Sequence, residues 1–137
     1  MANKKIGIYP MVADVIHAGH ILAIQEAKSK CDYLIVALHC CPDYKCPVQS
    51  IYERFVQLRY IKGVDEVIPY ENKEDCADML KSIPFDIYFL GMDHKDKDFE
   101  NKQLLIDMQK EICYLSRNHK YSSTYLKERI LGEENTL

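Results

Sequence analysis

Residues 5–39 read KIGIYPMVADVIHAGHILAIQEAKSKCDYLIVALH, and this stretch decides the fold. Residues 5–10 predict a strand, and residues 18–29 predict a helix whose apolar side chains cover a wide arc. Residues 33–39 form a near-continuous apolar run, which is typical of a strand buried on both faces of a parallel sheet. Because parallel strands need a crossover between them, the stretch predicts a strand–helix–strand unit.

The same alternation continues to the end of the chain. Further helices are predicted at residues 50–61, 73–81 and 103–110, and from Ser122 or Ser123 to Leu131 with Gly132 as the stop, and further strands at 66–69, 86–90 and 112–115. Five strands alternating with helices predict a single, doubly wound, Rossmann-like α/β sheet that is parallel throughout, with helices on both faces. We expect one domain over residues 1–132 and a frayed C-terminal tail at 133–137.

Composition restricts the classes of function. The chain has 137 residues, is 47% hydrophobic and carries a formal net charge of −3, so one domain can build a core without a field that attracts nucleic acid or an anionic membrane. No stretch approaches the length of a membrane span, and the N-terminus lacks the apolar region of a signal peptide. We therefore expect a cytoplasmic protein that binds neither nucleic acid nor membrane.

Six cysteines would suggest disulfides in a secreted protein, but nothing marks this chain for export, so thiols are expected. His39, Cys40, Cys41 and Cys46 together offer ligands of the type that zinc prefers. Adjacent Cys40 and Cys41 would point to opposite sides of an extended chain, and the spacing matches no standard zinc pattern. A buried or loop thiol cluster is therefore favoured over a metal site.

Ligands of doubly wound sheets lie beyond the carboxyl ends of the strands, so residues 11–20, 39–50, 70–73, 91–100 and 116–124 are where chemistry is expected. His17 and His20 fall in the first of these segments, at the start of the first helix. A helix N-terminus offers unpaired N–H groups to an anion, and Gly19 allows close approach of a phosphate. As a bare pattern, two unrelated histidines or half of a metal site would still be favoured.

The position of the two histidines in the chain, and a second motif near the C-terminus, change this interpretation. Residues 14–20 (DVIHAGH), directly after the first strand, resemble the HxGH motif of the nucleotidylyltransferase superfamily. Residues 117–124 (RNHKYSST), after the last strand, resemble the RTxGIST element of the cytidylyltransferases, especially the small bacterial glycerol-3-phosphate cytidylyltransferases. Residues 52–54 (YER), 64–69 (VDEVIP) and 91–93 (GMD) follow in the order of that family, so the resemblance covers nearly the whole chain.

The resemblance implies a reaction in which the phosphate of an acceptor attacks the α-phosphorus of a nucleoside triphosphate and pyrophosphate leaves. Because a phosphate monoester is already an anion, catalysis consists of holding the reactants in line and neutralising charge. The reactants that the resemblance favours are CTP and a small phosphorylated alcohol or polyol, with glycerol 3-phosphate as the first acceptor to test. It also implies Mg²⁺ with the nucleotide and a homodimer.

The resemblance also assigns residues to roles. His17, His20, Lys45 and Arg117 would be catalytic through contacts with the phosphates, and Asp93 would place Mg²⁺ or contact the nucleotide. Asp14 and Arg54 would adjoin the acceptor. The other nucleotide-binding residues that it implies are Met11, Val12, Gly19, Ser122, Ser123 and Thr124.

Each of several residues also has an alternative explanation without a function. Arg54 would be an ordinary surface arginine on an amphipathic helix, Lys45 and the charged segment 93–102 would be solvated, and His39 and His94 would be structural or exposed. Residues 11–14 (MVAD) stand where the family reads GTFD, and Lys120 stands where its second motif has glycine. An adenylyltransferase acting on a sugar or pantetheine phosphate, or a nucleotide-binding module without turnover, therefore stays open.

Overall fold

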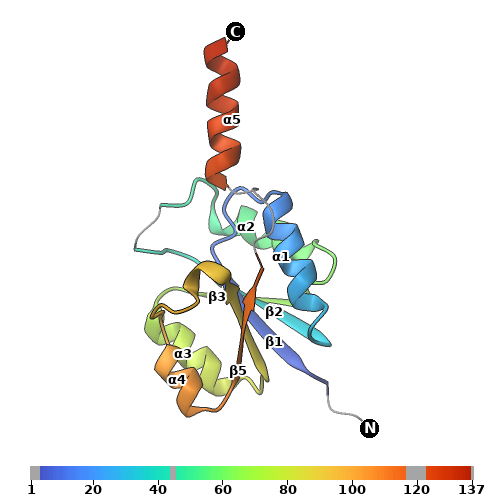
Figure 1. The fold of residues 1–137 in the computed structure, drawn as a ribbon, viewed down its shortest axis with the longest axis vertical. Coiled ribbons are helices and arrows are strands. Elements are labelled where there is room, and N and C mark those ends of the chain that lie inside the picture. The colour runs from blue at the N-terminus through green and yellow to red at the C-terminus, as the bar shows by residue number, and fades with distance from the viewer. Residues whose placement is uncertain (1–3, 44–45, 117–122, 137) are drawn as a thin grey trace.

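The computed structural model describes residues 4–43, 46–116 and 123–136. It contains one parallel sheet with strands β1 (Ile6–Met11), β2 (Tyr33–His39), β3 (Glu66–Tyr70), β4 (Ile87–Gly91) and β5 (Glu111–Leu115) (Figure 1). The strand order is β3-β2-β1-β4-β5, so the order reverses between β1 and β4. The predicted Rossmann-like α/β fold is confirmed.

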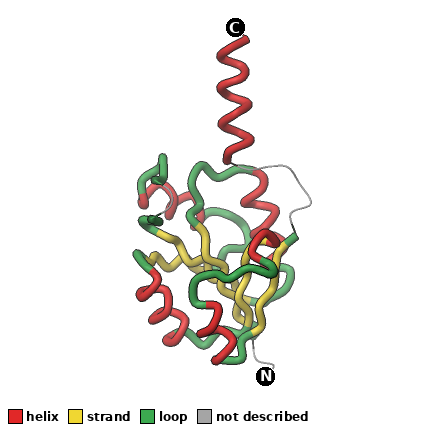
Figure 2. Tube along the Cα trace, turned by 60° about the vertical axis from the view of Figure 1, so that its left-hand side comes forward, coloured by secondary structure: helices red, strands yellow, loops and turns green. Residues whose placement is uncertain are grey.

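Helices cover both faces of this sheet (Figures 1 and 2). The helices are α1 (Ala18–Lys28), α2 (Ile51–Arg59), α3 (Lys73–Ser82), α4 (Lys102–Asp107) and α5 (Ser123–Thr136), with a 3-10 helix η1 (Met92–His94) after β4. Ile24 of α1 and Leu58 of α2 belong to one buried apolar cluster, whereas Leu80 of α3 and Leu105 of α4 belong to another. The sheet is therefore the middle of three layers.

Burial explains the run of apolar residues in β2, where residues 34–38 are at most 3% exposed. Gly7 of β1 is required by the same close packing, since a Cβ atom there would lie 2.5 Å from the Phe89 side chain and 3.0 Å from Cys31 Sγ. Phe89 is fully buried, and truncating such a side chain costs about 3–5 kcal/mol. The close packing of β1 against Phe89 of β4 therefore fixes the carboxyl ends of these two strands relative to each other.

The C-terminal ends of α4 and α5 differ most from the prediction, and those of α1 to α3 differ by one or two residues. Helix α4 stops at Asp107 instead of residue 110, because Gln109 has a left-handed φ of 59° that turns the chain into β5. Helix α5 continues through Gly132 to Thr136, so the predicted stop at Gly132 is wrong. Glycine adopts helical dihedrals as well as left-handed ones, and apart from the helix's own backbone none of the described atoms lies within 4 Å of where a Cβ of Gly132 would be. None of the described helices is long and apolar enough to cross a membrane.

Candidate active site

The first turn of α1 holds His17 and His20 in one defined arrangement. His17 is the N-cap residue, and its Nδ1 accepts a hydrogen bond from the Gly19 amide at 2.9 Å. The Nδ1 of His20 accepts from the His17 amide at 3.2 Å, which completes a capping box, and the two ring centroids are 4.1 Å apart. A neutral imidazole carries one N–H, so these bonds assign the proton of each ring to Nε2. The pair can thus present two donors to an anion at the helix N-terminus.

The loop before α1 is strained and firmly held. Ala13 and Val15 have left-handed φ angles of 57° and 52°. This conformation is especially costly for Val15, because its side chain is β-branched. Asp14 is only 1% exposed, and its two carboxylate oxygens accept the amides of Val48 and Gln49, each at 2.9 Å. The Gln49 side chain in turn accepts the Val15 amide at 2.7 Å. These bonds keep the strained loop, and with it His17, in place.

Arg54 joins the same region from α2. It is 2% exposed, so the alternative of an ordinary surface arginine is wrong. Its guanidinium donates to the carbonyls of Val12 (3.0 Å), His39 (2.8 Å), Cys40 (2.8 Å) and Gln49 (3.2 Å). Arg54 therefore ties the ends of β1 and β2 to the start of α2. Its contact with an acceptor stays a prediction, because the structure contains no acceptor and does not place Arg54 in the cavity lining.

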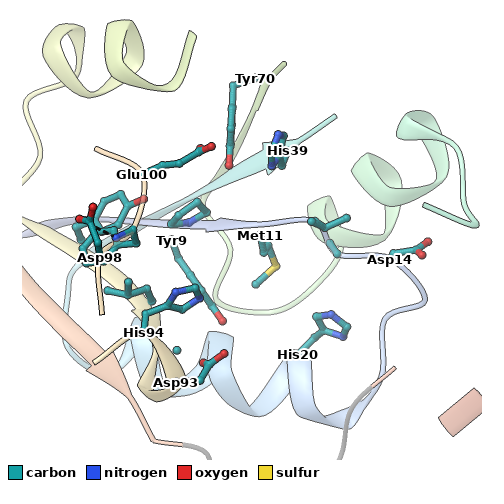
Figure 3. A pocket seen from close by; sticks show the side chains of 17 residues that line it. Tyr9, Met11, Asp14, His20, His39, Tyr70, Asp93, His94, Asp98 and Glu100 are labelled. Carbon is teal, nitrogen blue, oxygen red and sulfur yellow. Dashed lines mark hydrogen bonds between the residues drawn. The ribbon is translucent and has the colours of Figure 1, made fainter. Parts of the chain in front are cut away.

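A cavity of about 650 Å³ opens where the strand order reverses, at the carboxyl ends of the strands. It brings together the predicted residues Met11, Val12, Asp14, His20 and Asp93. Figure 3 shows His20 and Asp93 on the side of α1, with His39 and Tyr70 on the side of β2 and β3. A smaller hollow of about 90 Å³ adjoins it and is lined by His17, Gly19, His20 and Ser116 among others.

The far side of the cavity is aromatic and acidic, and sequence reasoning missed most of it. His39 and Tyr70 stack with ring centroids 4.6 Å apart, while Tyr88, His94, Asp98, Phe99 and Glu100 complete the wall. Burial raises the pKa of the Tyr88 hydroxyl well above its usual value, so it stays protonated. The one signal available was position at or just after the carboxyl end of a strand, which all of these residues except Tyr88 share.

Part of the predicted site lies outside the described residues. This applies to Lys45, Arg117 and Ser122. Of Ser123 and Thr124 the structure describes the backbone alone, at the start of α5. The roles of these five residues stay predictions.

The sequence offers two candidate metal sites: a zinc-type site at residues 39–46 and a Mg²⁺ site at Asp93. The six cysteines are free thiols, and across the described ranges no group of three or more His, Cys, Asp or Glu side chains could hold a metal ion. Mg²⁺ in nucleotide sites needs only one or two carboxylates, because phosphates and water supply the other ligands. Asp93, which lines the cavity together with His20, fits that requirement.

A parallel sheet with donors at the start of its first helix and a cavity at the switch point is the architecture of a nucleotide-binding protein. Comparison with known proteins identifies the family, since a model described as cytidylyltransferase-like matches residues 8–129. The chain belongs to the cytidylyltransferase-like family and is a nucleotidyltransferase, as its motifs predicted.

Individual relatives agree with this family. Glycerol-3-phosphate cytidylyltransferase of Bacillus subtilis (strain 168) is 33% identical over 123 residues, which are 87% of this chain and 92% of that protein. The Staphylococcus aureus protein of the same name is 28% identical, over 88% of this chain and 91% of its own length. The bifunctional protein HldE of Hydrogenovibrio crunogenus is 27% identical over 88% of this chain, which matches only 26% of HldE.

Among solved structures, the lipopolysaccharide core biosynthesis protein from Thermoplasma volcanium GSS1 superposes with a TM-score of 0.70. The match covers 88% of this chain and 100% of that chain at 23% sequence identity. This similarity supports the fold.

Proposed function

We propose that this protein is a cytidylyltransferase that joins CTP to a small phosphorylated alcohol, with glycerol 3-phosphate as the leading acceptor, and releases pyrophosphate. One observation carries the proposal: the Nδ1 atoms of His17 and His20 both accept backbone amides in the cap of α1, which fixes the two imidazole rings, and with them their Nε2 atoms, beside the cavity. Membership of the cytidylyltransferase-like family supports the choice of nucleotide.

In the proposed reaction, an oxygen of the acceptor phosphate attacks the α-phosphorus of CTP. The bond from that phosphorus to the bridging oxygen breaks on the opposite side, and pyrophosphate leaves with the electron pair. No proton has to be removed from the acceptor. The two Nε2–H groups and the N-terminus of α1 donate to phosphate oxygens on which negative charge increases, without having to reorganise in the transition state.

Mg²⁺ fits this site through Asp93, as expected for an ion that accompanies a nucleoside triphosphate. When bound, such an ion neutralises charge on the phosphates. The protein's own contribution there is one carboxylate that lines the cavity beside His20.

The chemistry of the cavity wall restricts the acceptor. The charged side chains that line it, within the part of the chain that the structure describes, are the carboxylates Asp14, Asp93, Asp98 and Glu100. Carboxylates accept hydrogen bonds, so the part of the acceptor away from its phosphate should carry donors. Hydroxyl groups of glycerol 3-phosphate meet this requirement. The ammonium group of an amino-alcohol phosphate meets it as well, which makes such a compound the second candidate acceptor.

A pyrophosphate-release assay tests the proposal. Each of the four nucleoside triphosphates is combined with glycerol 3-phosphate, phosphoethanolamine, phosphopantetheine and a sugar phosphate, with Mg²⁺ present. We expect release with CTP and one of the first two acceptors. Release with ATP and one of the last two would establish an adenylyltransferase instead. Tight CTP binding without release for any pair would identify a nucleotide-binding module.

We also propose that the protein acts in the cytoplasm as a homodimer, on small molecules and on neither nucleic acid nor membranes. The net charge of −3 supports the choice of small molecules. Helix α5 extends away from the sheet (Figures 1 and 2), and its Ile130 and Leu131 are 50% and 58% exposed, which supports burial against a second copy. Light scattering tests this state, with a mass of about twice 16.0 kDa expected and a monomeric mass overturning it.

A further inference from the structure

The end of β5 is held by a side chain rather than by another strand. β5 lies at the edge of the sheet, and its last paired residue is Leu115, opposite Gly91 of β4. The next residue, Ser116, donates its amide to Glu26 Oε2 at 3.1 Å and its hydroxyl to Glu26 Oε1 at 2.8 Å. Both carboxylate oxygens of Glu26 therefore fix the point at which the chain leaves the sheet.

Glu26 belongs to α1, the helix whose first turn contains His20. Its carboxylate also lies 3.4 Å from Lys30 Nζ, and this ammonium group contacts Cys113 Sγ of β5 at 3.6 Å. Partial burial opposes the charge, but the hydrogen bonds from Ser116 and Lys30 lower the pKa of Glu26 below its usual value. The carboxylate is thus ionised at neutral pH, when its hydrogen bonds are strongest.

The location of this contact connects it with the site. Ser116 lines the smaller hollow together with His17, Gly19 and His20. It also directly precedes Arg117, where the segment resembling the second family motif begins. Glu26 therefore joins the end of β5 to the helix that His17 caps, across 90 positions in the sequence.

We propose that Glu26 is a positioning residue for nucleotide binding, which holds Ser116 at a fixed place relative to His17 and His20 in the smaller hollow. This inference rests on the proposed function, since it assumes that the nucleotide occupies the hollow that Ser116 shares with His17 and His20. A carboxylate that only stabilised an edge strand would affect unfolding and leave nucleotide affinity unchanged.

The test compares the wild type with Glu26→Ala, Glu26→Gln and Ser116→Ala. Glu111→Gln is the matched control, because it removes an exposed ion pair with Lys5 (3.1 Å) at the opposite end of the same strand. The dissociation constant of CTP is measured by calorimetry, the KM values for CTP and acceptor by pyrophosphate release, and the unfolding midpoint by circular dichroism. All binding measurements are made well below the midpoint of each variant.

For Glu26→Ala we expect the Kd and KM for CTP to rise about tenfold or more, the scale of a lost charge-assisted hydrogen-bond pair. The acceptor KM should change less than about twofold. Glu26→Gln, which keeps one acceptor oxygen, and Ser116→Ala, which keeps the amide bond, should fall between Glu26→Ala and the wild type, with Glu111→Gln unchanged.

A lower unfolding midpoint for Glu26→Ala with an unchanged CTP Kd would overturn the proposal. If the wild type released no pyrophosphate with any acceptor, the proposed function would fail, yet the Kd series would still decide the role of Glu26. A wild type that did not bind CTP would overturn both.

Discussion

The two sides of the cavity are built in different ways. On the side of α1, His17 and His20 are fixed by backbone amides, and the loop before them is fixed by Asp14, Gln49 and Arg54. On the far side, residues 95–98 form an exposed loop of mixed charge, followed by the half-buried Phe99 and the exposed Glu100.

This difference suggests a division of labour. Reaction chemistry needs donors whose positions do not change as charge develops, and the α1 side provides them. Substrate choice depends on side chains that can differ between relatives while the phosphate site is kept, and surface loops tolerate such changes.

Exchanging the histidines for residues that preserve the helix cap should separate catalysis from stability. Asn is a favourable N-cap, and Gln completes a capping box, so His17→Asn and His20→Gln keep the Nδ1-type acceptors and lose the Nε2 donors. We expect kcat to fall by about 10²-fold or more for each variant, as for other preorganised donors. Chemical denaturation should show a change in the free energy of unfolding below about 1 kcal/mol. Near-normal kcat in both variants would contradict the assignment of the site.

How much of this arrangement was predictable depends on the range of the interactions. Strand β2 was readable because an apolar run is local, and the HxGH segment was readable because it resembles a short family motif and directly follows the first strand. The burial of Arg54 was not, since its carbonyl partners come from Val12, His39, Cys40 and Gln49, which the fold brings together. The same holds for Glu26 and Ser116. Helix amphipathicity alone cannot distinguish a surface arginine from one buried among carbonyls.

Arg54 tests how firmly the α1 side is held. Arg54→Met keeps the length of the side chain but leaves buried carbonyls without donors. We expect the free energy of unfolding, measured with urea, to fall by about 2–3 kcal/mol, because unsatisfied buried acceptors are costly. Arg54→Lys should recover part of the loss, since a single ammonium cannot reach all the carbonyls. If Arg54→Lys were fully stable but raised the acceptor KM, the predicted acceptor contact would be the better account.

The far side can be tested through Glu100, which lines the cavity. If the acceptor carries an ammonium group, Glu100→Gln should raise its KM by about fivefold, the scale of a partly exposed ion pair. For a hydroxylated acceptor such as glycerol 3-phosphate the change should stay below about twofold, because an amide oxygen still accepts a hydrogen bond. Asp96→Asn is the control, since Asp96 belongs to the same loop, does not line the cavity, and has a left-handed φ of 65° that Asn tolerates. A comparable KM increase in Asp96→Asn would assign the effect to the charge of the loop as a whole.

The smallest effect concerns pH and the link between α1 and β5. Partial burial raises the pKa of Glu26, whereas the hydrogen bonds from Ser116 and Lys30 lower it. The net effect is a pKa below the usual 4.5. A carboxylate with a lowered folded-state pKa contributes stability that is present above its unfolded pKa and is lost as pH falls through the folded value. In urea unfolding, the free energy of unfolding of the wild type should therefore fall below about pH 4.5. The fall should be smaller in Glu26→Gln. We expect the difference between the two proteins to be below about 1 kcal/mol, because water screens the 25% exposed side chain. Equal pH dependence in both proteins would mean that the carboxylate of Glu26 contributes nothing to holding α1 against β5.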